Sequence, residues 1–294
     1  MTAVVTTPAA PESVRPGGLV ARLASRLAKS VGILALCVVC VFPVYWMLVT
    51  ATLPTADLFD RTPELLPRPG DLAVFGDLVS GTPMLRWLAN STIIALGTTV
   101  ISVAFGVTCG YALSRTRFHG RGVLGFALFV TQMLPEALLV VPLYAVFAAL
   151  GLLNDLGGLV IVNAAFVVPI IAWMIKGAVD GVPAEIEEAA RVDGCPRLAT
   201  LRFVVLPVIK PSVAAAAVLA FFSAWNEYLF AATFATADAV KPTSVGLTTF
   251  IGEFATPMNV VMAGSLLYAL PAVVFFMLLQ RHVVSGLGAG AVKG

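Results

Sequence analysis

Charged side chains are scarce in this sequence of 294 residues. Asp, Glu, Lys and Arg together make up 12% of it, whereas hydrophobic residues make up 59%. A soluble domain carries roughly 25% charged residues, because its surface has to face water. The scarcity excludes a soluble globular protein of this length and predicts that much of the surface faces lipid.

Histidine and cysteine are also few, with two and four residues. Only Cys37 and Cys40 have a motif-like spacing, and they lie inside an apolar run, where packing is the better explanation. His119 and His282 are far apart, with no third metal ligand near either. We therefore expect neither a disulfide framework nor a metal site. The net charge is only +2, without a run of basic residues, which gives no reason to expect a nucleic-acid partner.

Long apolar stretches, in contrast, are abundant. A bilayer core of about 30 Å needs roughly 20 apolar residues in a helix. Six stretches meet this requirement, at residues 31–53, 88–113, 123–150, 156–175, 211–234 and 260–280. Four of them contain prolines at which we expect kinks, namely Pro43, Pro135, Pro142, Pro169 and Pro271. The sequence thus predicts an all-α membrane protein with six transmembrane helices.

The segments outside these stretches predict the orientation. Residues 1–30 are rich in Ala, Pro, Ser and Arg and lack an apolar core, which favours a disordered tail over a cleaved signal. Lys and Arg are retained on the cytoplasmic side, and a cytoplasmic N-terminus places fourteen of the 18 there. The chain then divides into a cytoplasmic N-terminal tail, a first transmembrane helix, an extracytoplasmic loop, a core transmembrane domain and a cytoplasmic C-terminal tail, at residues 1–30, 31–53, 54–86, 87–281 and 282–294.

The connection between the fourth and fifth stretches, residues 176–210, has a helical pattern of its own. Pro183 suits the first position of a helix, and Glu185, Glu187 and Glu188 lie in its early turns, where the helix dipole favours negative charge. Gly194 follows as a stop, at a position where a left-handed conformation is expected. We predict a short helix on the cytoplasmic side between Pro183 and Gly194.

This short helix has a narrow apolar face. Ile186, Ala189 and Ala190 fall at i, i+3 and i+4, and a second short helix is expected to begin at Cys195. Small alanines let another protein approach closely. An exposed helix–Gly–helix element of this kind is typical of a segment that docks into a groove of a partner.

The same connection carries a spaced motif. Glu188-Ala189-Ala190 is followed after three residues, Asp193 among them, by Gly194, and then by Val204, Leu206 and Pro207. This pattern resembles the loop signature of the inner-membrane permease subunits of ATP-binding-cassette importers, which has Ile where this chain has Val204. Six fixed residues match by chance at about one starting position in ten million. The resemblance implies that Glu188, Ala189, Ala190, Asp193, Gly194, Leu206 and Pro207 couple the permease to an ATPase.

Other segments resemble the maltose-type subgroup of these permeases, which imports oligosaccharides and related solutes. They are Asn90-Ser91, residues 111–115, residues 225–227 and residues 286–294. The resemblance implies a second permease subunit, an ATPase dimer and an extracytoplasmic solute-binding protein as partners, in the inner (plasma) membrane of a bacterium. The chain has no Gly-x-x-x-x-Gly-Lys-[Ser/Thr] phosphate cradle. We therefore expect a non-catalytic subunit that binds no cofactor, with ATP and Mg held by the partner ATPase.

Two carboxylates lie within the predicted spans, and ionisable groups at that depth are functional candidates. They are Glu136 and Glu227, the latter adjacent to Trp225 and Asn226. An indole stacks on a sugar face, and amides and carboxylates bind hydroxyls, so these four residues are candidates for the solute path. The alternatives are that Glu136 only satisfies backbone groups freed by Pro135, and that the partner permease carries the solute site.

The same features disfavour two rival functions. An ion-coupled secondary transporter would use Glu136 or Glu227 as a relay, but the six stretches show no clear inverted repeat. A channel would need a repeated filter segment, which the sequence lacks. A permease for amino acids or peptides stays open, and so does the choice among a disaccharide, an oligosaccharide and a glycerol phosphodiester as solute.

Overall fold

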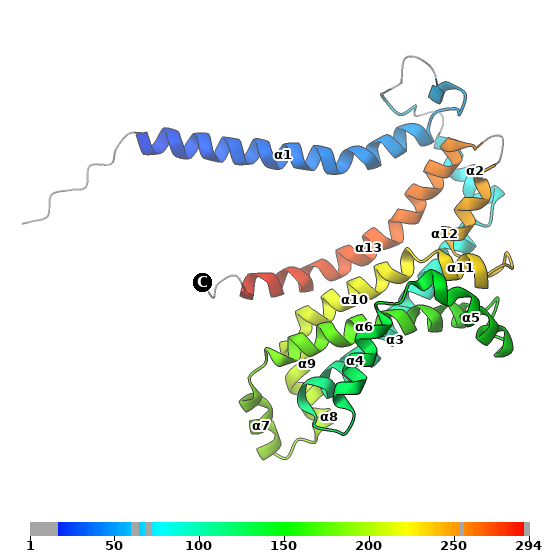
Figure 1. The fold of residues 1–294 in the computed structure, drawn as a ribbon. Coiled ribbons are helices and arrows are strands. Elements are labelled where there is room, and N and C mark those ends of the chain that lie inside the picture. The colour runs from blue at the N-terminus through cyan, green and yellow to red at the C-terminus, as the bar shows by residue number, and fades with distance from the viewer. Residues whose placement is uncertain (1–16, 60–64, 69–71, 253–255, 291–294) are drawn as a thin grey trace, which may run out of the picture.

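The computed structural model describes residues 17–59, 65–68, 72–252 and 256–290, and within these ranges every regular element is helical (Figure 1). The longer helices are α1 (Gly17–Ala51), α3 (Met84–Arg115), α4 (Arg121–Thr131), α5 (Glu136–Ala149), α6 (Leu156–Asp180), α10 (Lys210–Trp225) and α13 (Met258–Gly290). Shorter segments are η1 (Asp57–Phe59), α2 (Ala73–Gly81), α7 (Ala184–Val192), α8 (Arg197–Ala199), η3 (Thr200–Val205), α9 (Leu206–Val208), α11 (Leu229–Phe234), α12 (Thr243–Gly246) and η4 (Leu247–Phe250).

Four helices are long and apolar enough to cross a membrane, at Ala24–Ala51, Met84–Arg115, Leu156–Asp180 and Met258–Arg281. Two bent helix pairs also pass this test when each is taken together. They are α4 with α5, which meet at 105°, and Arg197–Val208 with Lys210–Trp225, which meet at 86°. The described residues therefore contain four to six candidate spans, as expected of an all-α membrane protein.

Helix α1 begins earlier than the sequence predicts. Residues 17–30 are helical and continue into the apolar stretch, so the prediction of a disordered tail up to residue 30 is wrong for them. Residues 1–16 lie outside the described residues. The segment is rich in Ala, Leu and Arg, which are strong helix formers, and an adjoining apolar helix removes the cost of nucleation.

The third and fifth predicted stretches are not continuous helices. Pro135 separates α4 from α5, which agrees with the kink expected there. The fifth stretch, predicted over 211–234, divides into α10 and α11. The break follows Trp225, because the carboxylate of Glu227 accepts hydrogen bonds from the backbone N–H groups of Phe230 and Ala231, at 2.6 and 3.0 Å, and starts a new helix.

Helices α3 and α6 form the centre of the bundle, and glycines let them approach closely. A Cβ on Gly106 would lie 2.4 Å from Cγ2 of Ile171, and one on Gly110 would lie 2.6 Å from the carbonyl oxygen of Ala172. Small residues at such contacts are the usual device for packing helices in a membrane. Ile175 is also fully buried in this contact. The two helices are thereby held as one unit.

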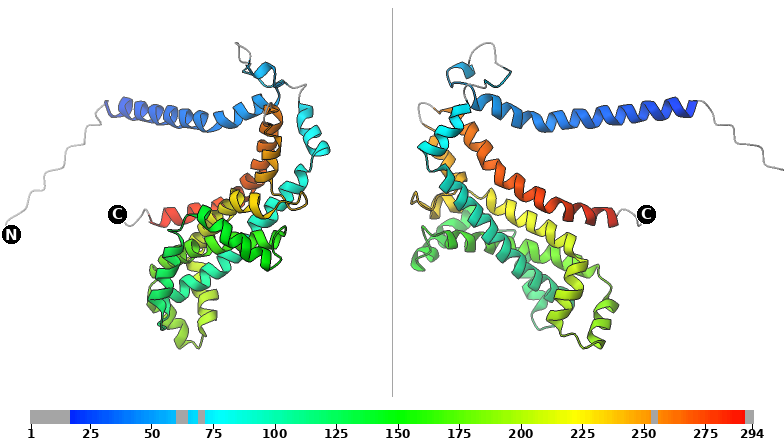
Figure 2. Two further views of the ribbon diagram at one scale, coloured as in Figure 1. Left: turned by 45° about the vertical axis from the view of Figure 1, so that its right-hand side comes forward. Right: turned by 180° about the vertical axis from the view of Figure 1, so that it is seen from behind.

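The two ends of the bundle differ. Figures 1 and 2 show α7 and α8 at one end, and α2 with the beginning of α13 at the other. We call these the α7 end and the α2 end. Helix α1 meets the bundle only near the α2 end, where Ala51 packs with Leu78, Met84 and Ala263. The rest of α1 leaves apolar side chains uncovered.

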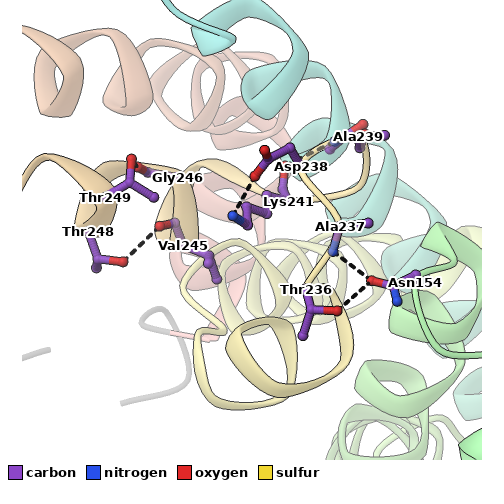
Figure 3. Close-up of polar contacts among 11 residues, drawn as sticks. Asn154, Thr236, Ala237, Asp238, Ala239, Lys241, Val245, Gly246, Thr248 and Thr249 are labelled. Atoms are coloured by element: carbon purple, nitrogen blue, oxygen red, sulfur yellow. Dashed lines mark hydrogen bonds and ion pairs between the residues drawn. The ribbon is translucent and has the colours of Figure 1, made fainter.

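The connection from α11 to α12, residues 235–242, is fixed by polar side chains (Figure 3). We call it the α11–α12 loop. Asn154, which has a left-handed φ of 54°, accepts hydrogen bonds at its Oδ1 from the Ala237 N–H at 2.8 Å and the Thr236 hydroxyl at 3.1 Å. Within the loop, Lys241 Nζ lies 2.5 Å from Asp238 Oδ1 and holds the pKa of that carboxyl below its ordinary value. The loop is therefore an ordered element.

Candidate functional site

Helix α7 has defined ends. Pro183 lies immediately before the helix rather than at its first residue, one position from the prediction, and Glu185 and Glu187 occupy the first turn. At the other end the Cys195 N–H donates to the Ala190 carbonyl at 3.0 Å and the Gly194 N–H to the Arg191 carbonyl at 3.1 Å. This pair of bonds is a Schellman motif, which needs a left-handed residue. Gly194 has φ 85°, as the sequence predicts.

Glu187 is the one carboxylate of α7 that points inward. Its side chain is buried, with the residue 2% exposed. Arg115 Nε lies 2.6 Å from its Oε1, and the Tyr111 hydroxyl donates to its Oε2 at 2.9 Å. The Arg115 guanidinium also donates to the carbonyl of Val179 at 2.8 Å and to that of Val182. A buried carboxylate therefore has an ionic partner and a second donor, as burial of a charge requires.

The apolar face expected on α7 is divided in the structure. Ala190 is buried with Glu187, whereas Ile186 and Ala189 are exposed. The periodicity of apolar residues missed the inward position because the residue there is charged. Tyr111 and Arg115, spaced i and i+4 at the end of an apolar stretch, are the signal that could have indicated a buried acidic partner.

The outward face of α7 carries most of the spaced motif. Glu188, Ala189, Asp193 and Gly194 are exposed, and Val192 is 88% exposed. Past the glycine, Leu206 is half-buried against the core, while Pro207 is exposed. The structure thus brings the first part of the motif together on a projecting surface, and it uses Leu206 to attach the returning chain to the bundle.

The solute-path candidates meet near the α10–α11 break. Glu136, Asn226 and Glu227 line a cavity of about 330 Å³, together with Asn163 and Tyr228. Sequence reasoning did not single out Asn163 or Tyr228, because they come from the middle of an apolar helix and from the break itself. The lining combines two carboxylates, two amides and the hydroxyl-bearing Ser223 and Tyr228 with apolar side chains, which suits a hydroxylated molecule.

Trp225 lies apart from the open part of this cavity. It is 3% exposed and stacks between Phe221 and Tyr268, with ring centroids 5.3 and 4.9 Å away. The Tyr268 hydroxyl donates to the Trp225 carbonyl. In this arrangement the indole has no free face for a sugar ring. Its contacts instead fix the end of α10, and with it the positions of Asn226 and Glu227.

Metal ligands do not gather anywhere in the described part of the chain, which has no group of three or more His, Cys, Asp or Glu residues placed to hold an ion. Cys37 and Cys40 are exposed on α1, and Cys109 and Cys195 are unpaired.

Comparison with known proteins identifies relatives that match almost the whole chain. The sequence is 34% identical over 256 residues to the diacetylchitobiose uptake system permease protein DasC of Streptomyces coelicolor, covering 86% of this chain and 92% of that protein. It is 32% identical over 253 residues to the sulfoquinovosyl glycerol transport system permease protein SmoH of Agrobacterium fabrum, covering 86% and 89%.

Comparison with solved structures also finds an ABC transporter. The fold matches a chain in the crystal structure of a bacterial ABC transporter involved in the import of the acidic polysaccharide alginate, with a TM-score of 0.71 and 27% identity over 94% of this chain and 99% of that chain. Residues 102–288, which include α7 and the cavity-lining residues, match the model of the binding-protein-dependent transport system inner membrane component. The chain therefore belongs to the family of binding-protein-dependent transport system inner membrane components, the permease subunits of ABC transporters.

Proposed function

We propose that this chain is the translocation subunit of an ATP-driven importer for a sugar, an oligosaccharide or a related glycoside. The observation that carries the proposal is the projecting surface of α7, which presents Glu188, Ala189 and Gly194 of the spaced motif while Glu187 ties the helix to α3. The names of the relatives, which include a diacetylchitobiose and a sulfoquinovosyl glycerol permease, favour a sugar solute.

We further propose that the chain crosses the membrane six times, with both termini and the α7 end in the cytoplasm. In this arrangement each bent pair counts as one span, and the α2 end and the α11–α12 loop face outward. The distribution of Lys and Arg supports this orientation. We keep the domain limits proposed from the sequence, except that the first helix begins at residue 17.

The proposed assembly has a second permease subunit, an ATPase dimer and an extracytoplasmic solute-binding protein. The chain itself is proposed to be non-catalytic, with ATP and Mg bound by the ATPase subunits. Closure of the ATPase dimer would displace the coupling surface at Glu188, Ala189, Asp193 and Gly194, with Ala190 packed beneath it. A rigid element displaced at one end of a helical bundle can shift it between inward-open and outward-open arrangements.

The coupling role is tested by Gly194→Asp and Glu188→Lys. The first places a Cβ at a left-handed position, which costs roughly 1 kcal/mol or more and misaims α7. The second reverses a charge on the exposed face. We expect both proteins to insert and fold, yet to lose solute-stimulated ATP hydrolysis and uptake in the reconstituted complex. Wild-type stimulation and uptake in both variants would overturn the proposal.

The cavity at the α10–α11 break is the proposed solute path. Glu227 already caps α11, so its replacement tests the fold as well as the solute. Glu136→Gln and Asn226→Ala test the solute contact with less effect on the fold than a change at Glu227. Glu136 is exposed, and the Asn226 side chain donates only to the Phe222 carbonyl of its own helix within the described residues. We expect slower uptake by both and normal uptake by Asn259→Ala, an amide truncation at the α2 end. Uptake unchanged in both cavity variants would move the solute site to the second permease.

A further inference from the structure

The charged contact beneath α7 joins it to a helix that reaches the opposite end of the molecule. We propose that α3 is a rigid rod that carries the motion of α7 directly to the α11–α12 loop, with Glu187, Arg115 and Tyr111 as its inner joint. This inference rests on the proposed function, because it names the path along which the displacement of α7 would travel. Arg115 and Tyr111 act in it as positioning residues.

The inner joint holds three segments at one point. Arg115 binds Glu187 of α7, the Val179 carbonyl near the end of α6 and the Val182 carbonyl of the connection between them. One residue earlier, the Ser114 hydroxyl lies 2.5 Å from Asp180 Oδ1. A buried ion pair with satisfied hydrogen bonds favours one arrangement over its alternatives. Helix α7 is therefore attached to α3 by side chains as well as to α6 by the backbone.

The rod itself is the least interrupted of the long helices in the described chain. Helix α3 has 32 residues, about 48 Å at the usual rise of 1.5 Å per residue, and it contains no proline. The other three candidate spans contain Pro43, Pro169 and Pro271, and α4 and α5 are separated by a bend. Because proline removes a backbone hydrogen bond and bends a helix, α3 is the element best suited to move as one body.

The outer joint lies at the first turns of α3. The Asn90 amide donates to the carbonyls of Ala239 and Lys241 at 3.0 and 2.9 Å, and the Ser91 hydroxyl accepts from the Thr243 N–H at 2.8 Å. Asn90 and Ser91 are both buried. A buried amide that satisfies two loop carbonyls holds the loop at a fixed distance from the helix. The α11–α12 loop is thus attached to α3 by two hydrogen bonds, and the first residue of α12 by a third.

A second contact strengthens the outer joint. Gly246 of α12 lies directly against the Trp87 ring, where an added Cβ would come within 2.3 Å of the indole. Packing this close leaves no room for α12 to slide on α3. Both ends of α3 therefore have specific attachments, to α7 at one end and to the segment 239–246 at the other. A displacement of α7 would therefore be passed to α3, and from α3 to the segment 239–246, because neither contact is loose.

The first experiment separates docking from transmission. The double variant Arg115→Gln/Glu187→Gln removes the ion pair without leaving an unpaired buried charge, and Tyr111→Phe removes only one hydrogen bond. Arg117→Gln and Glu185→Gln are matched controls, because they remove the same charges from exposed positions nearby. A cysteine at Glu188, cross-linked to the ATPase in the full complex, reports docking, and solute-stimulated ATP hydrolysis reports transmission.

We expect the double variant to keep the cross-link and to lose about tenfold in solute-stimulated hydrolysis, with Tyr111→Phe between it and the controls. Equal stimulation in the double variant and its controls would overturn the inference while leaving the coupling role of α7 intact. Failure of the Glu188→Cys protein, with no other change, to cross-link to the ATPase would instead contradict the proposed function.

The second experiment tests rigidity directly. Spin labels at Val192 and Asp238, which are both exposed, report the distance between the α7 end and the α11–α12 loop in one chain of the reconstituted complex. A rigid rod predicts the same distance with and without trapped ATP in the wild-type protein, and a broader or shifted distribution in the double variant. A wild-type distance that changes on ATP trapping would show that the two ends move independently, and the rod would be excluded.

Discussion

Two adjacent carboxylates of α7 have opposite environments. Glu187 is buried against Arg115 and Tyr111, whereas Glu188 is exposed. Removing one member of a buried ion pair leaves an uncompensated charge and costs about 3–5 kcal/mol, whereas an exposed carboxylate away from such contacts is worth about 0.5 kcal/mol. Loss of function at Glu187 therefore has to be separated from loss of stability, but loss of function at Glu188 points to a partner.

The contact between α3 and α6 depends on individual glycines, which gives a prediction at this scale. Gly110→Ala places a Cβ 2.6 Å from a backbone oxygen and 2.9 Å from a backbone nitrogen of α6, so the helices have to separate. We expect a loss of about 1–3 kcal/mol in stability. Gly177→Ala, inside α6 with nothing within 4 Å of the new Cβ, should instead gain about 0.5–1 kcal/mol from helix propensity.

The measurement is thermal unfolding of the two purified variants in detergent beside the wild-type protein. A lower midpoint for Gly110→Ala and an equal or higher one for Gly177→Ala are expected. If both variants unfolded at the same temperature, the close approach of α3 and α6 would not determine the stability of the bundle.

At the level of single helices, the start of α6 depends on a carboxylate that accepts a hydrogen bond from one of its first backbone N–H groups. Asp155 precedes α6, and its Oδ2 accepts a hydrogen bond from the Gly158 N–H at 2.8 Å. Asp155→Ala should cost about 1 kcal/mol, because it leaves that N–H without its cap, whereas Asp155→Asn should keep most of the cap. Denaturant titration followed by circular dichroism tests the order, and it would be contradicted by an Asn variant as unstable as the Ala variant.

The sequence predicted the elements better than their ends and their inward residues. Long apolar stretches predicted α1, α3, α6 and α13, because a bilayer sets a required length for them. The break after Trp225 was missed, since it arises from the carboxylate of Glu227 capping a new helix, and apolar composition continues through it. The helix stop with a left-handed residue at Gly194 was predicted because such a turn is local in sequence.

The candidate site divides in the same way. The residues of the α7 motif were identified by their resemblance to a family loop signature, which is local in sequence. The burial of Glu187 was not, because its partners Tyr111 and Arg115 lie more than 70 residues away in sequence. The same reason explains Trp225, whose stacking partner Tyr268 comes from α13. Contacts between distant segments are what a single sequence does not contain.

At the scale of the whole molecule, the apolar surface indicates surroundings that the single chain does not supply. Side chains such as Leu138 and Val141 of α5 and Val39 of α1 are exposed, although each lies in an apolar helix. Contiguous exposed apolar surface of this kind marks contact with lipid or with another subunit. The proposed second permease and the bilayer would together cover this surface. Helix α1, which is uncovered along most of its length, would bury the most apolar surface.

The proposed orientation in the membrane places the α7 end and the α11–α12 loop on opposite sides. Arg117 lies in the connection between α3 and α4, near the α7 end, and Asp238 lies in the α11–α12 loop; both are exposed. A cysteine at residue 187 would be buried, and one at residue 120 would add a Cβ at φ 88°, so neither is a suitable reporter.

In a protein without its four native cysteines, we expect an impermeant maleimide to label Asp238→Cys in intact spheroplasts and Arg117→Cys only in inverted vesicles. The physical reason is that Lys and Arg are retained on the cytoplasmic side during insertion. Labelling of both positions from the same side would require an even number of spans between α3 and the α11–α12 loop and would contradict the three proposed there. Labelling of Arg117→Cys in spheroplasts would turn the α7 end away from the ATPase and overturn the proposed coupling with it.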